Sequence, residues 1–264
     1  MQKIKILKHQ GKTGQEVRPL YFKKAFNLPI NNARIISFGA CNFNCAYCKR
    51  DGNFRDDNGG IVGAEEVELD EILQVCDDAI KKDQVVRLSG GDPVVFPGTS
   101  LAIAEYIKTN HNKKISIAHN GSSPEFMRRM LPYLESAAID LKATPEQMNS
   151  RIGTSNGSGE RMFWRSIETQ NLLADNGILV DVRTPIFGTN TLEDMLFLAK
   201  QIYNCKNLDN KFWTWRLYKK VKGCNWEEPN LENVIWMIKE VKKIYPDLKI
   251  GLRAKWEPGG FIYF

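Results

Sequence analysis

Three cysteines in the first fifth of the chain have the spacing of an iron–sulfur ligand set. Cys41, Cys45 and Cys48 follow the apolar run 35–38 (Ile-Ile-Ser-Phe). Three thiolates can hold three irons of a cubane cluster and leave the fourth iron open, whereas four thiolates close the cluster for electron transfer. Because an open iron can bind a ligand, the pattern predicts a cluster that takes part in chemistry on a bound molecule.

A structural zinc site is the alternative interpretation of these cysteines. Such a site needs four ligands, and it usually pairs one Cys-x-x-Cys with a second pair of Cys or His residues. The other candidate ligands are isolated from one another in the sequence: Cys76, Cys205, Cys224, His9, His111 and His119. The ligand count therefore favours the cluster over zinc.

A glycine pair forms the second signature. Residues 88–93 read Leu-Ser-Gly-Gly-Asp-Pro; they follow the β-branched pair Val85-Val86 and precede a predicted helix over 100–110. Glycine adopts φ values that other residues resist, so it lets the backbone approach a small polar ligand closely. Alone the pair indicates only a turn, but its combination with the cysteine triad is specific.

Together the two motifs resemble those of the radical S-adenosylmethionine (SAM) superfamily, in which the triad holds a [4Fe-4S] cluster and the Gly-Gly-Glu/Asp-Pro turn binds SAM. Later motifs resemble the glycyl-radical-enzyme activases of the pyruvate formate-lyase type. These are His119-Asn120-Gly121, Ile139-Asp140-Leu141-Lys142, Ile152-Gly153 with Ser155-Asn156, Val182-Arg183-Thr184-Pro185, and Leu217-Tyr218 with Trp226. The resemblance covers residues 34–228, and its first two motifs are the most specific.

The chain departs from the activases around the predicted substrate mouth. Ala118 and His119 stand where the activases carry an Asp that helps to hold a monovalent cation, so that cation site is not implied. Lys219 replaces a His, and 49–52 (Lys-Arg-Asp-Gly) replaces a common His-Asn pair. The resemblance consequently supports SAM chemistry better than it supports a particular protein substrate.

The resemblance implies a role for each motif residue. Cys41, Cys45 and Cys48 would hold the cluster, and Lys142 would bind the SAM carboxylate. The remaining residues implied in SAM binding are Gly90, Gly91, Asp92 and Pro93 near the methionyl amino group, Asn120, Asp140, the backbone around Tyr47, and Arg183 beside a carboxylate of SAM or substrate. Structural alternatives stay open: an Asp140–Lys142 ion pair, a barrel-closing Arg183 and a core Tyr47.

Cys224 is a candidate catalytic residue because it follows the last predicted strand in a loop. A thiol there could donate a hydrogen atom to a substrate radical, as epimerisation requires. An inert loop cysteine is the alternative, since thiol reactivity depends on local exposure and charge. Cys76 instead fits a helix core position, where cysteine behaves as a small apolar residue.

Three functions are therefore open. The leading one is hydrogen abstraction from a peptide or protein Cα, as in glycyl radical activation. The second is modification of a peptide or small molecule, with Cys224 or an outside donor quenching the radical. A non-catalytic iron–sulfur or zinc protein is the third.

Composition and length favour an α/β enzyme. The chain has 264 residues, of which 42% are hydrophobic and 26% charged, enough for one large α/β domain. No apolar run approaches the ~18–20 residues of a membrane span, and the basic start 1–5 lacks the apolar stretch of a signal peptide. We expect a cytoplasmic protein without membrane association, and a reducing compartment suits cysteines that form no disulfide framework.

The formal net charge of +6 is modest and is spread over separate Lys and Arg pairs, which are mostly solvated. Nucleic acid binding would need a basic stripe with interleaved aromatic residues. Trp213, Trp215 and Tyr218 beside Arg216 come nearest, but strand alternation explains them, so nucleic acid is a disfavoured partner. A positive surface suits an acidic electron donor such as flavodoxin or ferredoxin. We expect a monomer.

Short β-branched runs alternate with longer amphipathic runs. Strands are predicted at 34–38, 85–89, 114–118, 137–141, 178–184 and 212–217, and helices at 65–82, 100–110, 124–134, 145–152, 161–176, 192–203 and 231–245. Six strands alternating with helices imply a parallel sheet with right-handed crossovers, which the resemblance implies is curled into a partial (β/α)6 TIM-like barrel of the radical SAM type. Residues 1–33 are predicted to be an N-terminal extension, and 34–264 the core domain with a C-terminal helix and strand.

The motifs fall where this architecture needs them. Functional residues of α/β barrels lie at the C-terminal ends of strands and in the loops that follow. The segments that end or follow a predicted strand are Cys41–Cys48, Gly90–Pro93, Asn120, Asp140–Lys142, Arg183 and Tyr218.

Overall fold

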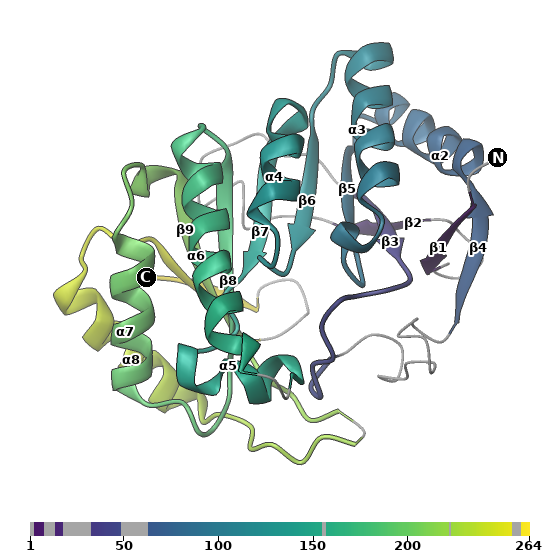
Figure 1. Ribbon diagram of the computed structural model, residues 1–264. Helices are drawn as coiled ribbons and strands as arrows, with labels where there is room; N and C mark the ends of the chain where they lie inside the picture. The colour runs from purple at the N-terminus through teal and green to yellow at the C-terminus, as the bar shows by residue number, and fades with distance from the viewer. Residues whose placement is uncertain are drawn as a thin grey trace. The chain divides into compact units, whose positions relative to one another are not determined.

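The computed structural model of the chain describes residues 3–7, 14–17, 33–48, 63–154, 157–221, 223–254 and 260–264 (Figure 1). Its contacts divide the chain into two compact units. Unit 1 comprises Met1–Asn42, Arg50–His119 and Glu125–Ala138, and unit 2 comprises Phe43–Lys49, Asn120–Pro124 and Ile139–Phe264. The domain boundary expected between residues 33 and 34 stays a prediction.

Unit 1 is built on a mixed sheet. Its strands are β1 (Lys3–Leu7), β2 (Gly14–Val17), β3 (Ala33–Phe38), β4 (Ala64–Glu68), β5 (Val85–Gly90) and β6 (Ile115–His119). They lie in the order β4-β1-β3-β5-β6, and β2 also pairs with β3. The pairs β3–β5 and β5–β6 are parallel, whereas β1, β2 and β4 join antiparallel.

Helices connect these strands. Helix α2 (Leu69–Lys81) precedes β5, and the 3-10 helix η1 (Pro93–Val95) and helix α3 (Pro97–His111) follow it. Helix α2 buries Ile72, Cys76 and Ala79 on one stripe, which confirms Cys76 as a core position. After β6 come α4 (Pro124–Met130), the 3-10 helix η2 (Leu131–Tyr133) and β7 (Leu134–Asp140).

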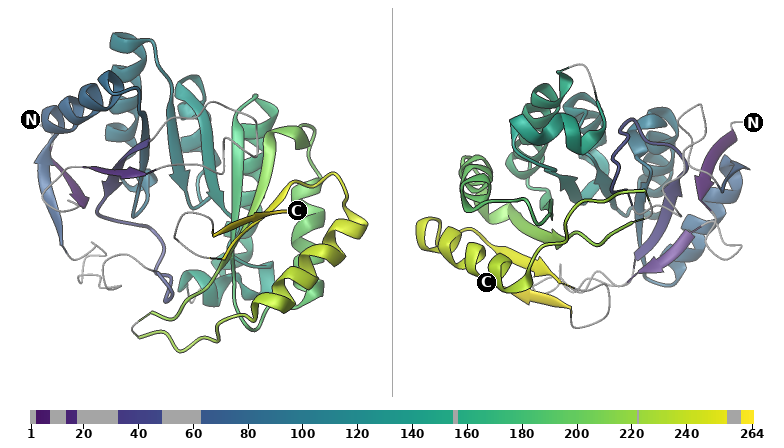
Figure 2. Two further views of the ribbon diagram at one scale, coloured as in Figure 1. Left: turned by 180° about the vertical axis from the view of Figure 1, so that it is seen from behind. Right: turned by 90° about the horizontal axis from the view of Figure 1, so that it is seen from below.

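Strands and helices also alternate in unit 2. The strands are β8 (Leu179–Ile186), β9 (Lys211–Leu217), β10 (Ile250–Arg253) and β11 (Phe261–Tyr263), and the helices are α5 (Pro145–Ile152), α6 (Ser158–Asp175), α7 (Leu192–Tyr203) and α8 (Leu231–Ile244), with the 3-10 helix η3 (Leu208–Asn210). β8, β9 and β10 are parallel neighbours, and β11 pairs antiparallel with β10, as the yellow strands of Figure 2 show.

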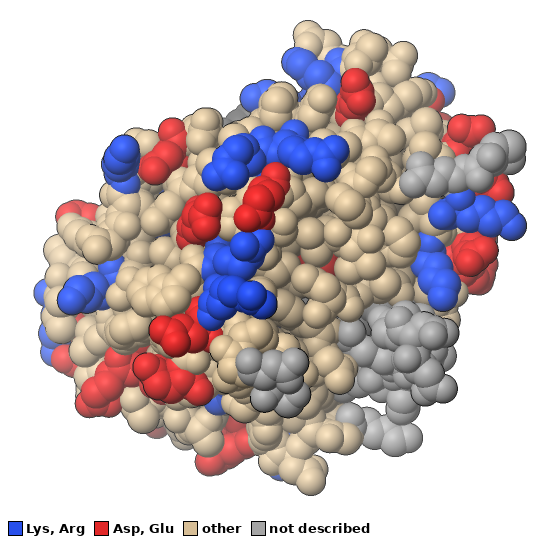
Figure 3. All heavy atoms as spheres, in the orientation of Figure 1, with Lys and Arg blue, Asp and Glu red and all other residues tan. Residues whose placement is uncertain are grey.

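The aromatic residues of β9 belong to the core of unit 2. Trp213 and Trp215 are fully buried, and the Trp213 indole donates a 2.8 Å hydrogen bond to the Thr184 hydroxyl on β8. The alternation of side chains between the two faces of β9 therefore accounts for Trp213 and Trp215, as predicted. Lys and Arg are interspersed with Asp and Glu on the face drawn in Figure 3. No helix in the described parts of the chain has the length and apolar character of a membrane span.

Two predicted helices are wrong at their ends. The helix predicted from Glu65 begins at Leu69, because 64–68 form β4. That strand pairs with β1 so that Lys3 faces Glu68 and Lys5 faces Glu66, and opposite charges across strands are favourable. The helix predicted over 124–134 leaves α-helical geometry after Met130, where Pro132 removes a backbone donor.

The glycine pair packs directly against the strand that leads to the cysteines. Gly91 donates its N–H to the Phe38 carbonyl at 2.6 Å, and Asp92 donates to the Ala40 carbonyl at 2.7 Å. Gly90 has a φ of 100°, and a Cβ there would lie 2.1 Å from the Phe38 nitrogen; a Cβ on Gly91 would lie 1.9 Å from the Ala40 oxygen. Both positions therefore need glycine for backbone packing.

We expect Gly90→Ala to lower the free energy of unfolding by about 2–5 kcal/mol, the combined range for a side chain in left-handed backbone and for overpacking. Urea denaturation of the protein, followed by circular dichroism, measures this change. Gly98→Ala is the matched control, because no atom lies within 4 Å of its added Cβ. Equal unfolding free energies for the two variants would contradict the packing role.

Candidate active site

Two of the three motif cysteines lie on one tight turn in unit 2. Cys48 donates its backbone N–H to the Cys45 carbonyl at 3.1 Å, and Asn44 donates to the carbonyl of Ile152, at the end of α5, at 2.9 Å. Gly153 permits this approach, since a Cβ there would lie 2.2 Å from the Asn44 oxygen. The turn that carries Cys45 and Cys48 is thus anchored to α5.

Cys41 belongs to unit 1 and follows Ala40, whose carbonyl accepts the hydrogen bond from Asp92. All three motif cysteines are half-exposed thiols. Among the described residues, no three His, Cys, Asp or Glu side chains are grouped closely enough to hold a single metal ion. The thiols of Cys41, Cys45 and Cys48 are chemically suited to an iron–sulfur cluster, because half-exposed thiols on a loop can ionise and bind iron.

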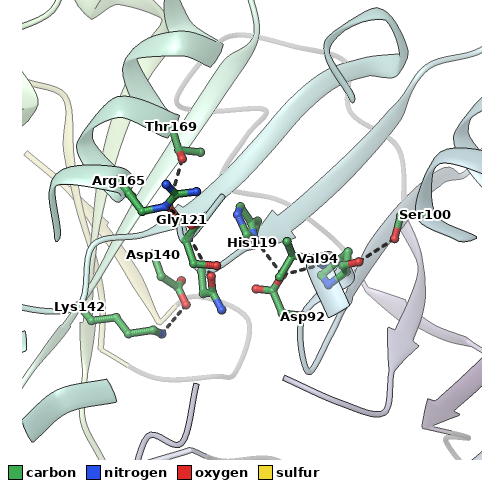
Figure 4. A network of polar contacts seen from close by, with 12 residues as sticks. Asp92, Val94, Ser100, His119, Gly121, Asp140, Lys142, Arg165 and Thr169 are labelled. Atoms are coloured by element: carbon green, nitrogen blue, oxygen red, sulfur yellow. Dashed lines mark hydrogen bonds and ion pairs between the residues drawn. The ribbon is translucent and has the colours of Figure 1, made fainter. Parts of the chain in front are cut away.

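Asp92 is a buried carboxylate held from two sides. Its Oδ1 accepts a 3.0 Å hydrogen bond from the Val94 N–H and lies 2.8 Å from Nδ1 of His119, at the end of β6 (Figure 4). The His119 ring also packs edge-on against Phe126, with ring centres 5.9 Å apart. The sequence indicated His119 as part of the His119-Asn120-Gly121 motif but did not predict this contact; its place at a strand end is the signal that it faces the turn that carries Asp92.

Asn120 and Gly121 form a turn fixed by α6 in unit 2. The Asn120 side-chain oxygen accepts the Ser122 N–H at 3.0 Å, and the Gly121 carbonyl accepts the Thr169 hydroxyl at 3.1 Å. Arg165 donates its Nε–H to the Ser122 carbonyl at 2.5 Å (Figure 4). The side chain of Asn120 therefore shapes its own turn, and its contact with SAM stays a prediction.

Asp140 and Lys142 form the ion pair that the sequence left open. The Lys142 ammonium lies 2.6 Å from Oδ2 of Asp140. Burial opposes ionisation of Asp140, but the charges of Lys142, Arg216 and Arg183 outweigh it and lower the pKa of the carboxyl. Burial also opposes the charge of Lys142, yet Asp140 raises the pKa of this ammonium well above its ordinary value. Both groups are therefore charged at neutral pH.

Arg183 lies on β8 beside a second buried carboxylate. Its Nε–H donates to Oδ2 of Asp181 at 2.5 Å, and the Thr214 hydroxyl on β9 donates to Oδ1 of the same residue at 2.5 Å. The Asp181 side chain is 1% exposed, whereas that of Arg183 is 14% exposed. Asp181 thus orients Arg183, a residue pair that the sequence did not reveal.

Tyr47 and Cys224 join an aromatic cluster in unit 2 with Phe187, Tyr218 and Trp226. The Tyr47 ring centre lies 5.0 Å from that of Phe187 and 5.6 Å from that of Trp226. The Tyr218 hydroxyl donates a 3.2 Å hydrogen bond to the Cys224 carbonyl. Burial raises the pKa of Tyr47.

Cys224 is therefore a buried thiol and not an open loop cysteine. Its role as a hydrogen donor stays a hypothesis, and its burial favours the inert alternative. The sequence also missed Arg151 of α5, whose guanidinium carbon lies 4.0 Å from the centre of the Phe187 ring and 4.5 Å from that of Trp226.

The chain is similar to known proteins in sequence and in fold. A 7-carboxy-7-deazaguanine synthase from Methanothermobacter thermautotrophicus is 23% identical over 175 residues, which are 64% of this chain and 67% of the synthase. A probable GTP 3′,8-cyclase from Methanothermobacter marburgensis is 36% identical over 98 residues, which are 36% of this chain and 28% of the cyclase. The match therefore spans only a quarter to two thirds of these relatives.

A solved radical SAM methyltransferase from Sphaerobacter thermophilus has the same fold, with a TM-score of 0.61 and 11% identity over 86% of this chain and 67% of its own. The predicted α/β fold class of the radical SAM type is thus confirmed. The model of the family described as the radical SAM superfamily matches residues 35–202. Because that match spans well over half of the chain, this protein belongs to the radical SAM superfamily, whose enzymes use a [4Fe-4S] cluster and SAM.

Proposed function

We propose that this radical SAM enzyme abstracts a hydrogen atom from a small polar molecule. The observation that carries the proposal is a group of ionised side chains in unit 2: Asp140 and Lys142 at and just after the end of β7, and Asp181 and Arg183 within β8. Their side chains are 30%, 11%, 1% and 14% exposed, in that order. Buried charge is costly unless it is paired or used, and such a lining suits an enclosed polar substrate.

Asp92 is the proposed partner of the SAM ammonium group. It is a carboxylate 2% exposed to solvent, and its own N–H is bonded to the residue before Cys41. His119 and the Val94 N–H fix its orientation. The SAM carboxylate is assigned to Lys142, which would share its charge between that group and Asp140.

When bound, the cluster and SAM supply one-electron chemistry that yields methionine and a 5′-deoxyadenosyl radical. The enzyme needs an electron donor, for which flavodoxin or ferredoxin is the proposed class. A primary radical reacts with the nearest C–H bond, so the chain's task is to position the substrate and to exclude water. The aromatic cluster of Tyr47, Phe187, Tyr218 and Trp226 supplies apolar surface for that exclusion.

The names of the two curated relatives support a small-molecule substrate, since one acts on GTP and the other makes 7-carboxy-7-deazaguanine. A peptide or protein Cα, as in glycyl radical activation, is the second candidate. It is supported by the Asp140-Leu141-Lys142 and Val182-Arg183-Thr184-Pro185 motifs, although neither of those relatives nor the methyltransferase is an activase by name.

A fractionated cell extract separates the two substrate classes. We expect the low-molecular-weight filtrate to accelerate 5′-deoxyadenosine formation by the reduced, cluster-loaded enzyme, because a small substrate passes through the ultrafiltration membrane that retains proteins. The retentate before and after protease digestion is the control. Acceleration by the untreated retentate alone would replace the small-molecule proposal with the protein one.

His119→Phe should weaken SAM binding about 10- to 100-fold, the equivalent of one hydrogen bond to a charged group. The phenyl ring keeps the packing against Phe126 but cannot hold Asp92. His119→Asn, whose amide can donate to Asp92, should recover part of the affinity. Equilibrium dialysis on cluster-loaded protein measures both variants. Wild-type affinity in His119→Phe would show that Asp92 needs no such support.

Cys224→Ala should form 5′-deoxyadenosine and product as the wild type does, because a thiol enclosed by Phe187, Tyr218 and Trp226 is shielded from a substrate radical. Cys205→Ala controls for the removal of a thiol. If Cys224 is instead the hydrogen donor, its variant will cleave SAM, lose product and accumulate a substrate radical visible by electron paramagnetic resonance.

A further inference from the structure

The C-terminal end of α5 contacts the turn that carries Cys45 and Cys48. At the start of the turn, the Asn44 N–H donates to the Ile152 carbonyl at 2.9 Å. This contact joins main chain to main chain and fixes where the turn begins. A second set of contacts from the same end of α5 involves side chains, and it reaches the turn at the residue before Cys48.

Arg151 begins this second set of contacts. Its guanidinium carbon lies 4.0 Å from the centre of the Phe187 ring and 4.5 Å from that of the Trp226 ring. The same guanidinium donates from Nη2 to the Thr189 hydroxyl at 3.1 Å. A cation over an aromatic ring is attracted more strongly where water is excluded, and Arg151 is 7% exposed. The guanidinium therefore holds both rings against α5.

The charge of Arg151 persists in this buried position. Burial lowers the pKa of Arg151, whereas Tyr47, Asp194 and Cys224 act on it in the opposite direction. An arginine remains protonated in proteins at neutral pH. The attraction between the guanidinium and the two rings is therefore present under the conditions in which the enzyme works.

The two rings belong to separate loops of unit 2. Phe187 follows β8, and Trp226 lies in the segment between β9 and α8. Gly188 donates its N–H to the Glu227 carbonyl at 2.9 Å, which brings the two segments together. The Phe187 and Trp226 ring centres are 5.0 Å apart with their planes at 82°, an edge-to-face arrangement that aromatic pairs prefer.

Tyr47, the residue before Cys48, packs on the same two rings. Its ring centre lies 5.0 Å from that of Phe187 and 5.6 Å from that of Trp226. The planes of Tyr47 and Phe187 meet at 77°, again edge to face. The position of the Tyr47 side chain therefore depends on the two rings that Arg151 holds.

We propose that Arg151 is a positioning residue for the iron–sulfur cluster. It acts through Tyr47, whose ring it supports by way of the other two aromatic rings, and it thereby keeps the Cys45–Cys48 turn in one conformation. Groups that orient the ligands of a metal site without touching the metal raise its affinity. The inference depends on the predicted cysteine ligands and is independent of the substrate class.

The test measures how fast iron leaves the cluster-loaded protein when a ferrous chelator is added without oxygen. Arg151→Gln should release iron about threefold faster or more, because it loses the cation that holds the rings. Arg151→Lys, which keeps a cation, should release iron at a rate between those of Arg151→Gln and the wild type. The midpoint of thermal unfolding is measured on the same variants without metal.

Ile238→Ala controls for a general loss of stability. Ile238 is fully buried in α8, so its truncation should lower the unfolding midpoint without accelerating iron release. An equal acceleration in Ile238→Ala, or a wild-type release rate in Arg151→Gln, would overturn the proposal. Trp226→Leu, which removes one of the two rings, carries the test if Arg151→Gln does not fold, and a wild-type release rate in Trp226→Leu would then overturn the proposal.

Tyr47→Leu tests the route from Arg151 to the turn. This variant should also release iron faster, and the addition of Arg151→Gln should cause little further acceleration, because both changes remove one support. Fully multiplicative effects would overturn the route through Tyr47. Cys48→Ala should fail to load a complete cluster; normal loading would overturn the ligand set together with the proposal, whereas failure of the Arg151 variants alone would leave the ligand set in place.

Discussion

Two backbone hydrogen bonds in unit 1 join the glycine turn to the segment that leads into the motif cysteines, and the proposed chemistry depends on this connection. Gly91 and Asp92 donate to the carbonyls of Phe38 and Ala40, and both bonds require that no Cβ intervene at residues 90 and 91. They join the chain segment that ends at Cys41 to the turn that carries a buried carboxylate. A proposed cluster ligand and the proposed partner of the SAM ammonium group are thereby linked through four residues of main chain.

Unit 2 accommodates charged side chains within its sheet. β8 and β9 present to the core a mainly apolar face, which also buries Lys211, and they carry Asp181, Arg183 and Arg216 on the other face, as the two-residue period of a strand requires. On the ionic face each carboxylate stabilises a neighbouring cation: Asp181 orients Arg183, and Asp140 holds Lys142 charged. Such pairs add little net stability when buried, but they keep side chains in one orientation. That orientation is what a radical reaction needs, because selectivity depends on which C–H bond lies nearest.

Much of this architecture could be predicted from the sequence, and the exceptions have physical causes. The six parallel strands and the cysteine and glycine motifs follow from local pattern, because each run carries its own periodicity. Strand β4 could not be predicted, because the sequence of Ala64–Glu68 alone does not indicate a strand. The strand forms through its pairing with Lys3 and Lys5, which lie more than 60 positions earlier in the chain. The support of Asp92 by His119 was likewise hidden, because only the fold brings together two side chains that are 27 positions apart. The contact of Asp181 with Arg183, two positions apart on β8, could have been predicted from their spacing. The sequence predicted the ion pair of Asp140 and Lys142 as an alternative, since only Leu141 separates them.

The distribution of the cysteines has a consequence for handling the protein in air. Cys76 and Cys224 are buried. Burial raises the pKa of the Cys76 thiol to about 12, so this thiol is almost entirely protonated at neutral pH. The half-exposed cysteines are Cys41, Cys45, Cys48 and Cys205. Sulfenic acid formation follows thiolate character and solvent access. Oxygen and electrophiles are therefore expected to react with these cysteines, three of which are the proposed cluster ligands, before they react with the core thiols.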